Sequence, residues 1–328
     1  MQPKVSVILL SFNQVKYIQK AINSIFEQSY ENWELIISDN GSTDGTQDIC
    51  KKYKNSEKVK LQLFDSNEFI TKRYKQAINE ATGEYISILY GDDYYLAKKI
   101  ETQVNLFKNL GEDWGVVHGP GFSLDERTGK RVISVSSEAN GESLKTLLED
   151  YFRKGFINPI SPLIKKVCFD NYPSYEDIFT EAECLFFKFS LSYKFFYFKE
   201  PLVVMREHET NARWHSKRNI EILDICLDRL SNFEEFPQEC LGSLSSLRVR
   251  TFNLGAWESI RLGIDSKWTR NRIYQSLKID SLQIFNIRNI IAYTFTFLPN
   301  ILVIKLNNLI DFIFSRKRQN YFQEPWEN

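Results

Sequence analysis

Two adjacent aspartates, Asp92 and Asp93, end the apolar segment GEYISILYGDD. Neighbouring carboxylates repel one another and shift each other's pKa unless a cation or hydrogen-bond donors offset their charge. A hard divalent cation takes oxygen ligands and shares them with substrate phosphates, so one or two protein carboxylates can hold it. The pair therefore indicates a cation site, and the alternative is a solvated cap at a turn.

A second polar segment, SDNGSTDGT, occupies residues 38–46 and also follows an apolar run. Its glycines permit turn conformations, and its Ser, Thr and Asp residues can cap a following helix. The carboxylate of Asp39 can accept hydrogen bonds from the N–H groups of a planar base. The alternative is a plain strand–turn–helix junction. Neither a P-loop nor a GxGxxG segment follows the first apolar run, so the fingerprints of mononucleotide kinases and dinucleotide-binding enzymes are absent.

Short β-rich runs alternate with helical patterns over the first hundred residues. The runs predict strands at 5–12, 33–40, 59–66 and 83–93, and the segments between them predict helices at 17–26, 47–53 and 70–81. Such alternation is typical of a parallel sheet with helices on its faces. Ligands bind beyond the carboxyl ends of the strands of such sheets, so the polar segments at these ends are expected to share one edge.

The later part of the chain is less regular. A helix is predicted at 96–110, a strand at 114–125, a hairpin turn at 127–130 and a helix at 144–152. Residues 184–198 indicate a helix that passes into a strand, and the chain from residue 216 onward indicates helices.

Three segments, VSVILLSFN from Val5, WELIISDNGSTDGT from Trp33 and ATGEYISILYGDD from Ala81, resemble at these separations the N-terminal half of a family 2 glycosyltransferase. The resemblance extends over about residues 5–103 and more weakly over 175–211. It implies a GT-A (Rossmann-like) α/β fold with a mostly parallel central sheet and helices on both faces. Residues 1–215 would form this domain, and residues 216–328 would form a helical C-terminal region.

The resemblance also implies an activity. Family members transfer a sugar from a nucleotide diphosphate sugar to a glycan or lipid-linked acceptor, usually with inversion and with Mn²⁺ or Mg²⁺, and commonly in surface polysaccharide synthesis. The position-by-position comparison gives the residues of the nucleotide site as Ser11, Phe12, Asn13, Asp39, Asp44, Arg73 and Asp92. It gives Asp93 and His208 to the metal and Arg206 to the diphosphate. An earlier aspartate of the family pattern is replaced here by Tyr90.

The transfer reaction needs a base, because the acceptor hydroxyl must lose its proton as it attacks, and a carboxylate within hydrogen-bond reach can take that proton. The resemblance implies an aspartate at the start of a helix, but that position is Ala182 in this chain. The candidates for the catalytic base are therefore Glu183, Glu181 and Asp177, in that order. The alternative is that these are exposed acids at a helix start, where the helix dipole favours them.

The charge of the chain is unevenly distributed. The 42 basic and 42 acidic residues cancel, which argues against a general nucleic-acid binder, but residues 241–328 contain 12 Lys/Arg and 6 Asp/Glu. Between Arg288 and Lys305 lie 16 uncharged residues, a stretch that is short for a spanning helix and is interrupted by Pro299. The stretch predicts a helix that lies in a membrane interface. The alternatives are a helical hairpin that covers a core and a contact between two copies of the chain.

Five cysteines without a CxxC pair predict reduced thiols in a cytoplasmic protein, and the N-terminus lacks the apolar region of a secretory signal. Together with the basic C-terminal region, this predicts a peripheral protein at the inner face of the cell membrane.

Two other functions are compatible with the sequence. A sugar-nucleotide pyrophosphorylase would carry a Gly- and Arg/Lys-rich loop after the first strand, and a non-catalytic nucleotide-binding homologue is suggested by Ala182.

Overall fold

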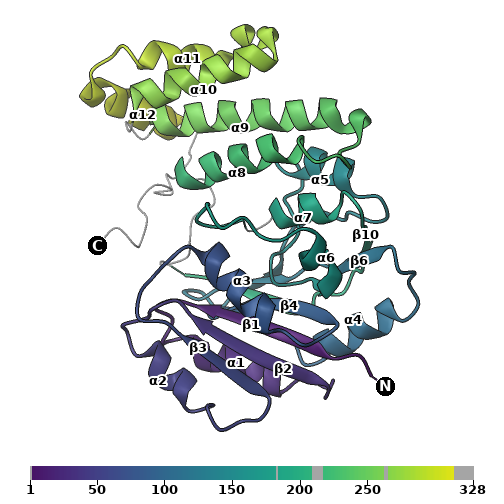
Figure 1. The fold of residues 1–328 in the computed structure, drawn as a ribbon. Helices are drawn as coiled ribbons and strands as arrows, with labels where there is room; N and C mark the ends of the chain where they lie inside the picture. The colour runs from purple at the N-terminus through teal and green to yellow at the C-terminus, as the bar shows by residue number, and fades with distance from the viewer. Residues whose placement is uncertain (1, 182–183, 209–216, 262–264, 314–328) are drawn as a thin grey trace. The chain divides into compact units, whose positions relative to one another are not determined.

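The computed structural model describes residues 2–181, 184–208, 217–261 and 265–313. The chain divides into two compact units, residues 1–209 and 210–328 (Figure 1). The domain boundary predicted after residue 215 falls in the segment 209–216, which lies outside the described residues.

The first unit is built on a seven-stranded sheet with the strand order β10-β6-β9-β4-β1-β2-β3. The strands are β1 (Val5–Ser11), β2 (Trp33–Asp39), β3 (Val59–Leu63), β4 (Tyr85–Tyr90), β6 (Trp114–His118), β9 (Leu163–Lys165) and β10 (Lys194–Tyr197). Strand β9 runs antiparallel to its neighbours β4 and β6, and the other pairs are parallel. The predicted mostly parallel central sheet is confirmed.

Helices cover both faces of this sheet, which is why β1 and β2 are buried along their whole length. On one face Leu9 of β1 belongs to an apolar core with Ile22 of α1 (Ile18–Phe26) and Ile100 of α4 (Lys99–Phe107). Helix α3 (Ile70–Glu80) covers the opposite face (Figure 1). The remaining helices of this unit are α2 (Thr46–Lys51), α5 (Leu144–Asp150), α6 (Lys166–Asn171) and α7 (Cys184–Phe189).

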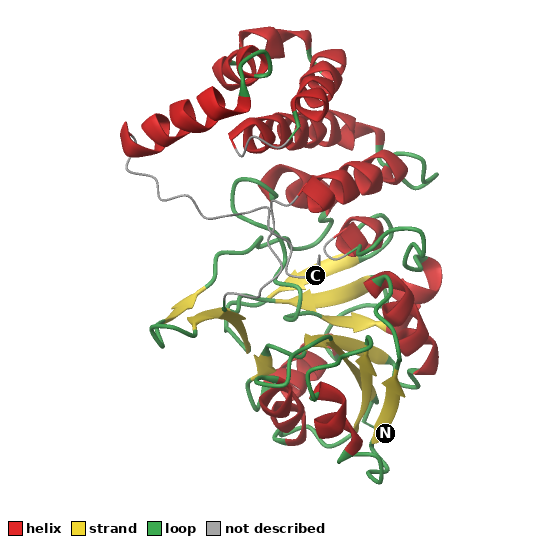
Figure 2. Ribbon diagram, turned by 90° about the vertical axis from the view of Figure 1, so that its left-hand side faces the viewer, coloured by secondary structure: helices red, strands yellow, loops and turns green. Residues whose placement is uncertain are grey.

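A second, smaller sheet has the strand order β5-β11-β7-β8. Its strands are β5 (Tyr94–Tyr95), β7 (Phe122–Asp125), β8 (Arg131–Ile133) and β11 (Val203–Glu207), and both sheets are drawn in yellow in Figure 2. Strand β5 follows Asp93 directly and pairs antiparallel with β11. This pairing brings the aspartate pair to the late segment that contains Arg206 and His208.

The single strand predicted over 114–125 is wrong, because the chain leaves the large sheet after β6 and enters the small sheet at β7. The segment between them is Gly119-Pro120-Gly121. Proline lacks the N–H that a central strand needs. The backbone of Gly119 also passes so close to Phe198 that a Cβ atom would lie 2.7 Å from its carbonyl oxygen. The predicted turn at 127–130 is confirmed between β7 and β8.

The second unit is helical, as predicted, with α8 (Lys217–Leu230), α9 (Leu241–Arg261), α10 (Ser266–Ile279), α11 (Ile287–Phe295) and α12 (Asn300–Ile313). Its small apolar core joins α9, α10, α11 and α12 through Ala256, Ile260, Ile273, Ala292 and Val303. Among the described residues, no helix combines the length and the apolar character that crossing a membrane requires.

Glu34 of β2 is a carboxylate inside the first unit, with only 6 % of its side chain exposed. It accepts hydrogen bonds from Ser6 Oγ at 2.6 Å, from the backbone N–H of Thr82 at 2.7 Å and from Lys4 Nζ at 3.0 Å. Burial alone would raise the pKa of Glu34, but these hydrogen bonds lower it from 4.5 to about 2. The ionised carboxylate therefore stabilises the folded chain.

The pH dependence of unfolding tests this role. The unfolded chain binds the proton at the higher pH, so the stability from Glu34 is present above about pH 4.5 and is lost as the pH falls toward 2. We expect Glu34→Gln to lower the free energy of unfolding at pH 7 by about 2 kcal/mol and to flatten its decline in acid. Urea unfolding at several pH values measures both, with the exposed Glu27→Gln as the control. An unchanged acid limb in Glu34→Gln would contradict the assignment.

Candidate functional site

The carboxyl ends of β1 and β2 are joined through Asp39, whose side chain is fully buried. Asp39 Oδ2 accepts hydrogen bonds from Ser11 Oγ at 2.8 Å and Ser42 Oγ at 2.6 Å. Asp39 Oδ1 accepts from the backbone N–H of Ser42 and from Gln47 Nε2, both at 2.9 Å. Two predicted nucleotide residues, Ser11 and Asp39, are thus in contact. Because four donors already occupy this carboxylate, an N–H group of a nucleotide base can donate to it only by displacing one of them.

The loop after β1 is hydrogen-bonded to the loop after β2. Asn13 has φ +52° and accepts the N–H of Thr43 at 3.0 Å through its side-chain oxygen. Asp44 accepts the N–H of Val15 at 2.9 Å and that of Thr46 at 3.0 Å. Burial alone would raise the pKa of Asp44, but hydrogen bonds from the Thr46 hydroxyl, at 2.6 Å, and from these N–H groups lower it below its usual value. Asp44 therefore acts on the shape of this edge as an ionised acceptor of backbone N–H groups. The predicted Phe12, half-buried, lies in the same loop.

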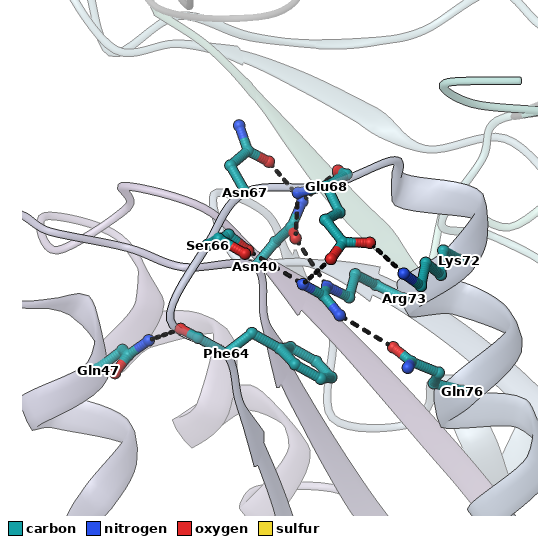
Figure 3. Close-up of polar contacts among 9 residues, drawn as sticks. All are labelled: Asn40, Gln47, Phe64, Ser66, Asn67, Glu68, Lys72, Arg73 and Gln76. Atoms are coloured by element: carbon teal, nitrogen blue, oxygen red, sulfur yellow. Dashed lines mark hydrogen bonds and ion pairs between the residues drawn. The ribbon is translucent and has the colours of Figure 1, made fainter.

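Arg73 of α3 ties the loop after β2 to the loop after β3 (Figure 3). Its Nε donates to Asn40 Oδ1 at 2.9 Å and its Nη2 to the carbonyl oxygen of Ser66 at 3.0 Å. The guanidinium lies 3.5 Å from the ring centroid of Phe64, and the residue is 4 % exposed. The two loops are so close that a Cβ atom at Gly41, where φ is +83°, would lie 2.5 Å from the carbonyl carbon of Ser66. Arg73 therefore holds these two loops together at this edge of the sheet.

Asp92 and His208 meet at the junction of the two sheets. Asp92 Oδ2 lies 3.3 Å from His208 Nε2, and the two side chains are 15 % and 9 % exposed. The imidazole stacks on the ring of Tyr17, with the centroids 4.6 Å apart and the planes at 21°. A carboxylate oxygen and an imidazole nitrogen are thus presented side by side, and both are metal-ligand atoms.

Asp93 is oriented differently from its neighbour. It is only 6 % exposed, and its Oδ1 accepts the backbone N–H of Arg206 at 2.9 Å. Burial, and the negative charge of Asp92, raise the pKa of Asp93 well above its usual range. The side chain is thus placed to join β11 to the end of β4.

The guanidinium of Arg206 lies next to the same pair. Its Nη1 donates to the carbonyl oxygen of Asp92 at 3.1 Å, and its Nε lies 3.0 Å from Glu126 Oε1. Its Cζ lies 5.1 Å from the ring centroid of Tyr17 and 5.0 Å from that of Tyr94. Arg206 is therefore surrounded by protein groups on several sides.

The candidate bases occupy different environments. Glu181 is 2 % exposed, its Oε1 lies 2.5 Å from Lys188 Nζ, and its Oε2 accepts the N–H of Tyr175 at 3.0 Å. Asp177 is exposed. Glu183, the first choice from the sequence, lies outside the described residues. The buried ion pair fits Glu181 for a structural role better than for accepting a substrate proton.

A small cavity of about 30 Å³ lies beside this ion pair. Its polar lining comes from Thr71, Tyr74, Tyr90, Ser174, Thr180 and Glu181. The volume is that of one or two water molecules, far less than a sugar ring needs. Tyr90, which stands where the family pattern has an aspartate, is thus part of the wall of this cavity.

Sequence reasoning missed Tyr17 and Glu126 as residues of the site. From the sequence, Tyr17 is placed only at the start of the helix predicted at 17–26, although Tyr17 follows the end of β1 closely and the rule that ligands bind at the carboxyl ends of strands points to it. Glu126 is in the turn of a hairpin of the second sheet. No sequence pattern links it to Arg206, because their contact exists only through the parallel pairing of β7 with β11.

A glycosyltransferase family model matches this chain, and the relatives EpsE and TuaG are both named as glycosyltransferases. The model of the family described as "Glycosyl transferase family 2" matches residues 6–168. The chain is 40 % identical over 104 residues to EpsE and 36 % identical over 104 residues to TuaG, both of Bacillus subtilis (strain 168). Each match covers 31 % of this chain, and the chain spans only 37 % and 41 % of the length of these two relatives.

The fold matches solved structures over most of the chain. The crystal structure of S. aureus TarS 1–349 in complex with UDP-GlcNAc superimposes with a TM-score of 0.67, at 16 % identity, over 88 % of this chain and 89 % of that chain. The mannosyltransferase PcManGT from Pyrobaculum calidifontis, in complex with GDP-Man and Mn²⁺, gives a TM-score of 0.55 at 15 % identity, over 97 % of this chain and 89 % of that chain. The predicted GT-A fold is confirmed.

Proposed function

Because residues 6–168 belong to glycosyl transferase family 2, we propose that this chain transfers a sugar from a nucleotide diphosphate sugar to a glycan or lipid-linked acceptor. The observation that carries the proposal is the convergence of Asp92 and His208 at the sheet edge where strands β1 and β2 also end. TuaG is named for teichuronic acid biosynthesis, which favours surface polysaccharide synthesis as the setting.

The Asp92–His208 pair is the proposed site of a divalent cation, Mn²⁺ or Mg²⁺. Within the described parts of the chain, no three His, Cys, Asp or Glu side chains are grouped as ligands of one ion. Two protein ligands fit a cation that takes its remaining ligands from a diphosphate and water. The sequence comparison gave the metal to Asp93, but burial and the hydrogen bond from Arg206 favour Asp92 for that role. When bound, the cation would offset the negative charge that gathers on the departing diphosphate.

The loops of residues 11–15 and 39–46 are the proposed nucleotide site. Their hydrogen bonds to Asp39 and Asp44 fix the shape of the edge before a ligand arrives. The printed titles of the TarS and PcManGT structures name UDP-GlcNAc and GDP-Man as their ligands, which supports a nucleotide-sugar donor for this chain.

In the transfer step, the acceptor oxygen forms a bond to the anomeric carbon while the bond from that carbon to the diphosphate oxygen breaks. Attack from the side opposite the diphosphate inverts the anomeric configuration. The acceptor hydroxyl gives its proton to a carboxylate, and we assign this role to Glu183, since Glu181 is paired with Lys188. Asp177 is the second candidate because it is exposed.

Donor turnover tests the proposed function. The full chain is incubated with Mn²⁺ and a panel of UDP-, GDP- and dTDP-sugars, with and without polysaccharide acceptors, and release of the nucleoside diphosphate is measured. Release of a diphosphate supports a transferase. Formation of a nucleoside triphosphate from added pyrophosphate would instead support a pyrophosphorylase, and nucleotide binding without turnover would support a non-catalytic homologue.

The second unit is the proposed membrane-contacting part. Phe285, Ile287 and Phe297 are 77 %, 72 % and 64 % exposed, and Arg288 and Lys305 are exposed near them in the sequence. Exposed apolar side chains with flanking cations match an anionic lipid surface, where the apolar groups enter the interface and the cations meet headgroups. This location would bring the enzyme to a lipid-linked acceptor.

Vesicle binding checks this location. We expect the triple variant Phe285→Ser, Ile287→Ser, Phe297→Ser to bind phosphatidylglycerol vesicles at least about tenfold more weakly than the unchanged chain. The variant removes the apolar side chains that would be buried in the membrane interface on binding. Co-sedimentation measures the partition, and Val135→Ser, which changes an 80 % exposed residue of the first unit, is the control. Unchanged vesicle binding would contradict the proposal, and a smaller particle mass in light scattering would assign the surface to a contact between copies.

A further inference from the structure

We propose that Glu126 is a positioning residue that holds the Asp92–His208 pair in place through Arg206. The inference rests on the proposed function, in which that pair holds a divalent cation. Glu126 lies between β7 and β8, and its backbone N–H donates to the carbonyl oxygen of Glu207 at 3.1 Å. The turn is therefore anchored to β11 directly beside the two functional residues.

Arg206 contacts the backbone of Asp92 and the ring of Tyr17, on which His208 stacks. Its Nη1 donates to the backbone carbonyl of Asp92 at 3.1 Å, which restrains the aspartate from the main-chain side. Its guanidinium lies 5.1 Å from the ring centroid of Tyr17, the same ring on which His208 stacks at 4.6 Å. Arg206 thus acts on Asp92 through a hydrogen bond and on His208 through a shared aromatic neighbour.

Glu126 supplies the carboxylate beside this guanidinium. Its Oε1 lies 3.0 Å from Arg206 Nε, and the side chain of Arg206 is only 9 % exposed. A cation so little exposed needs a paired carboxylate, because water does not offset its charge. The guanidinium of Arg206 already contacts the backbone carbonyl of Asp92. Without Glu126, the guanidinium is attracted to the carboxylate of Asp92 as well, where it competes with a bound cation. The ion pair therefore keeps Asp92 available.

This arrangement gives Arg206 a different role from the diphosphate contact that the sequence comparison implied. The guanidinium is engaged by Glu126, by the Asp92 carbonyl and by the faces of Tyr17 and Tyr94. A positioning role changes the affinity for the cation, whereas a diphosphate contact changes the affinity for the nucleotide even without a cation. The two roles therefore differ in a measurable way.

The test compares Glu126→Gln with Glu138→Gln, an exposed glutamate of the same unit, in the full chain. Mn²⁺ binding in the presence of UDP or GDP is followed by electron paramagnetic resonance. The ring resonances of His208, assigned with the help of His208→Gln, are followed by NMR without added metal. We expect Glu126→Gln to weaken Mn²⁺ binding about tenfold or more and to shift the His208 ring resonances, and Glu138→Gln to change neither.

Wild-type Mn²⁺ affinity and ring resonances in Glu126→Gln would overturn the inference. In Arg206→Lys, a loss of Mn²⁺ affinity with unchanged metal-free UDP and GDP affinity supports it, and a loss of metal-free nucleotide affinity assigns Arg206 to the diphosphate and overturns it. If the unchanged chain binds neither UDP nor GDP when Mn²⁺ is present, this result contradicts the proposed function. The His208 resonances still report whether Glu126 positions the pair in that case.

Discussion

Replacing Asp92 by asparagine is expected to lower the kcat/KM for the nucleotide sugar by about a thousandfold. The amide keeps the shape of the side chain but removes the charge that would hold the proposed cation next to His208. The Mn²⁺ concentration needed for half-maximal activity should rise in the same variant. Steady-state kinetics at several Mn²⁺ concentrations measure both changes.

Asp93→Asn distinguishes the two adjacent aspartates. Because Asp93 is buried and accepts the N–H of Arg206, we expect its variant to lower the thermal midpoint while leaving the Mn²⁺ requirement of the remaining activity nearly unchanged. The exposed Asp170→Asn serves as the control for removing a carboxylate. The assignment fails if Asp93→Asn raises the Mn²⁺ requirement and Asp92→Asn does not.

The second large effect separates Glu181 from Glu183. Glu181→Gln should lower the free energy of unfolding by about 3 kcal/mol, because it leaves the buried Lys188 without its paired carboxylate. Glu183→Gln should leave the unfolding free energy unchanged and lower kcat by about a hundredfold to ten-thousandfold, since it removes the proposed base. Urea unfolding and donor turnover, measured on both variants, give the comparison.

A double variant controls for the ion pair. Glu181→Gln combined with Lys188→Met removes both charges, and we expect it to recover most of the lost stability, as replacing both partners of a buried pair often does. If Glu181→Gln is as stable as the unchanged chain and loses turnover, the base is Glu181 instead. Retained turnover in both single variants would pass the role to Asp177, which is exposed.

Much of the first unit could be predicted from local patterns. The strands at Val5, Trp33 and Tyr85 are mainly apolar runs that are buried along nearly their whole length, and the edge strand at Val59 is a β-rich run that is only partly buried. The position of Asp92 at the sheet edge follows from the same reasoning, because the carboxyl ends of parallel strands meet at one edge. Within the described residues after residue 216, the predicted helical character is also confirmed.

The strand predicted over 114–125 and the roles of single acidic residues could not be settled in this way. The sequence does not show that Lys188, seven residues later, is buried in an ion pair with Glu181. The surroundings of a carboxylate decide whether it can act as a base or is held in an ion pair. Likewise, Asp92 and Asp93 are adjacent and identical in type, but one faces His208 and the other is buried against Arg206.

Over about residues 5–90, the sequence by itself determined which elements form and which edge of the sheet carries the polar loops, because hydrophobic periodicity and turn residues act over a few neighbouring positions. Only the tertiary structure decided which side chains share that edge. The pairing of β5 with β11 brings Asp92 to His208, and the pairing of β7 with β11 brings Glu126 to Arg206. These contacts join residues about 80 to 116 positions apart, and the charge, burial and hydrogen bonds that set their chemistry arise only when distant strands pair.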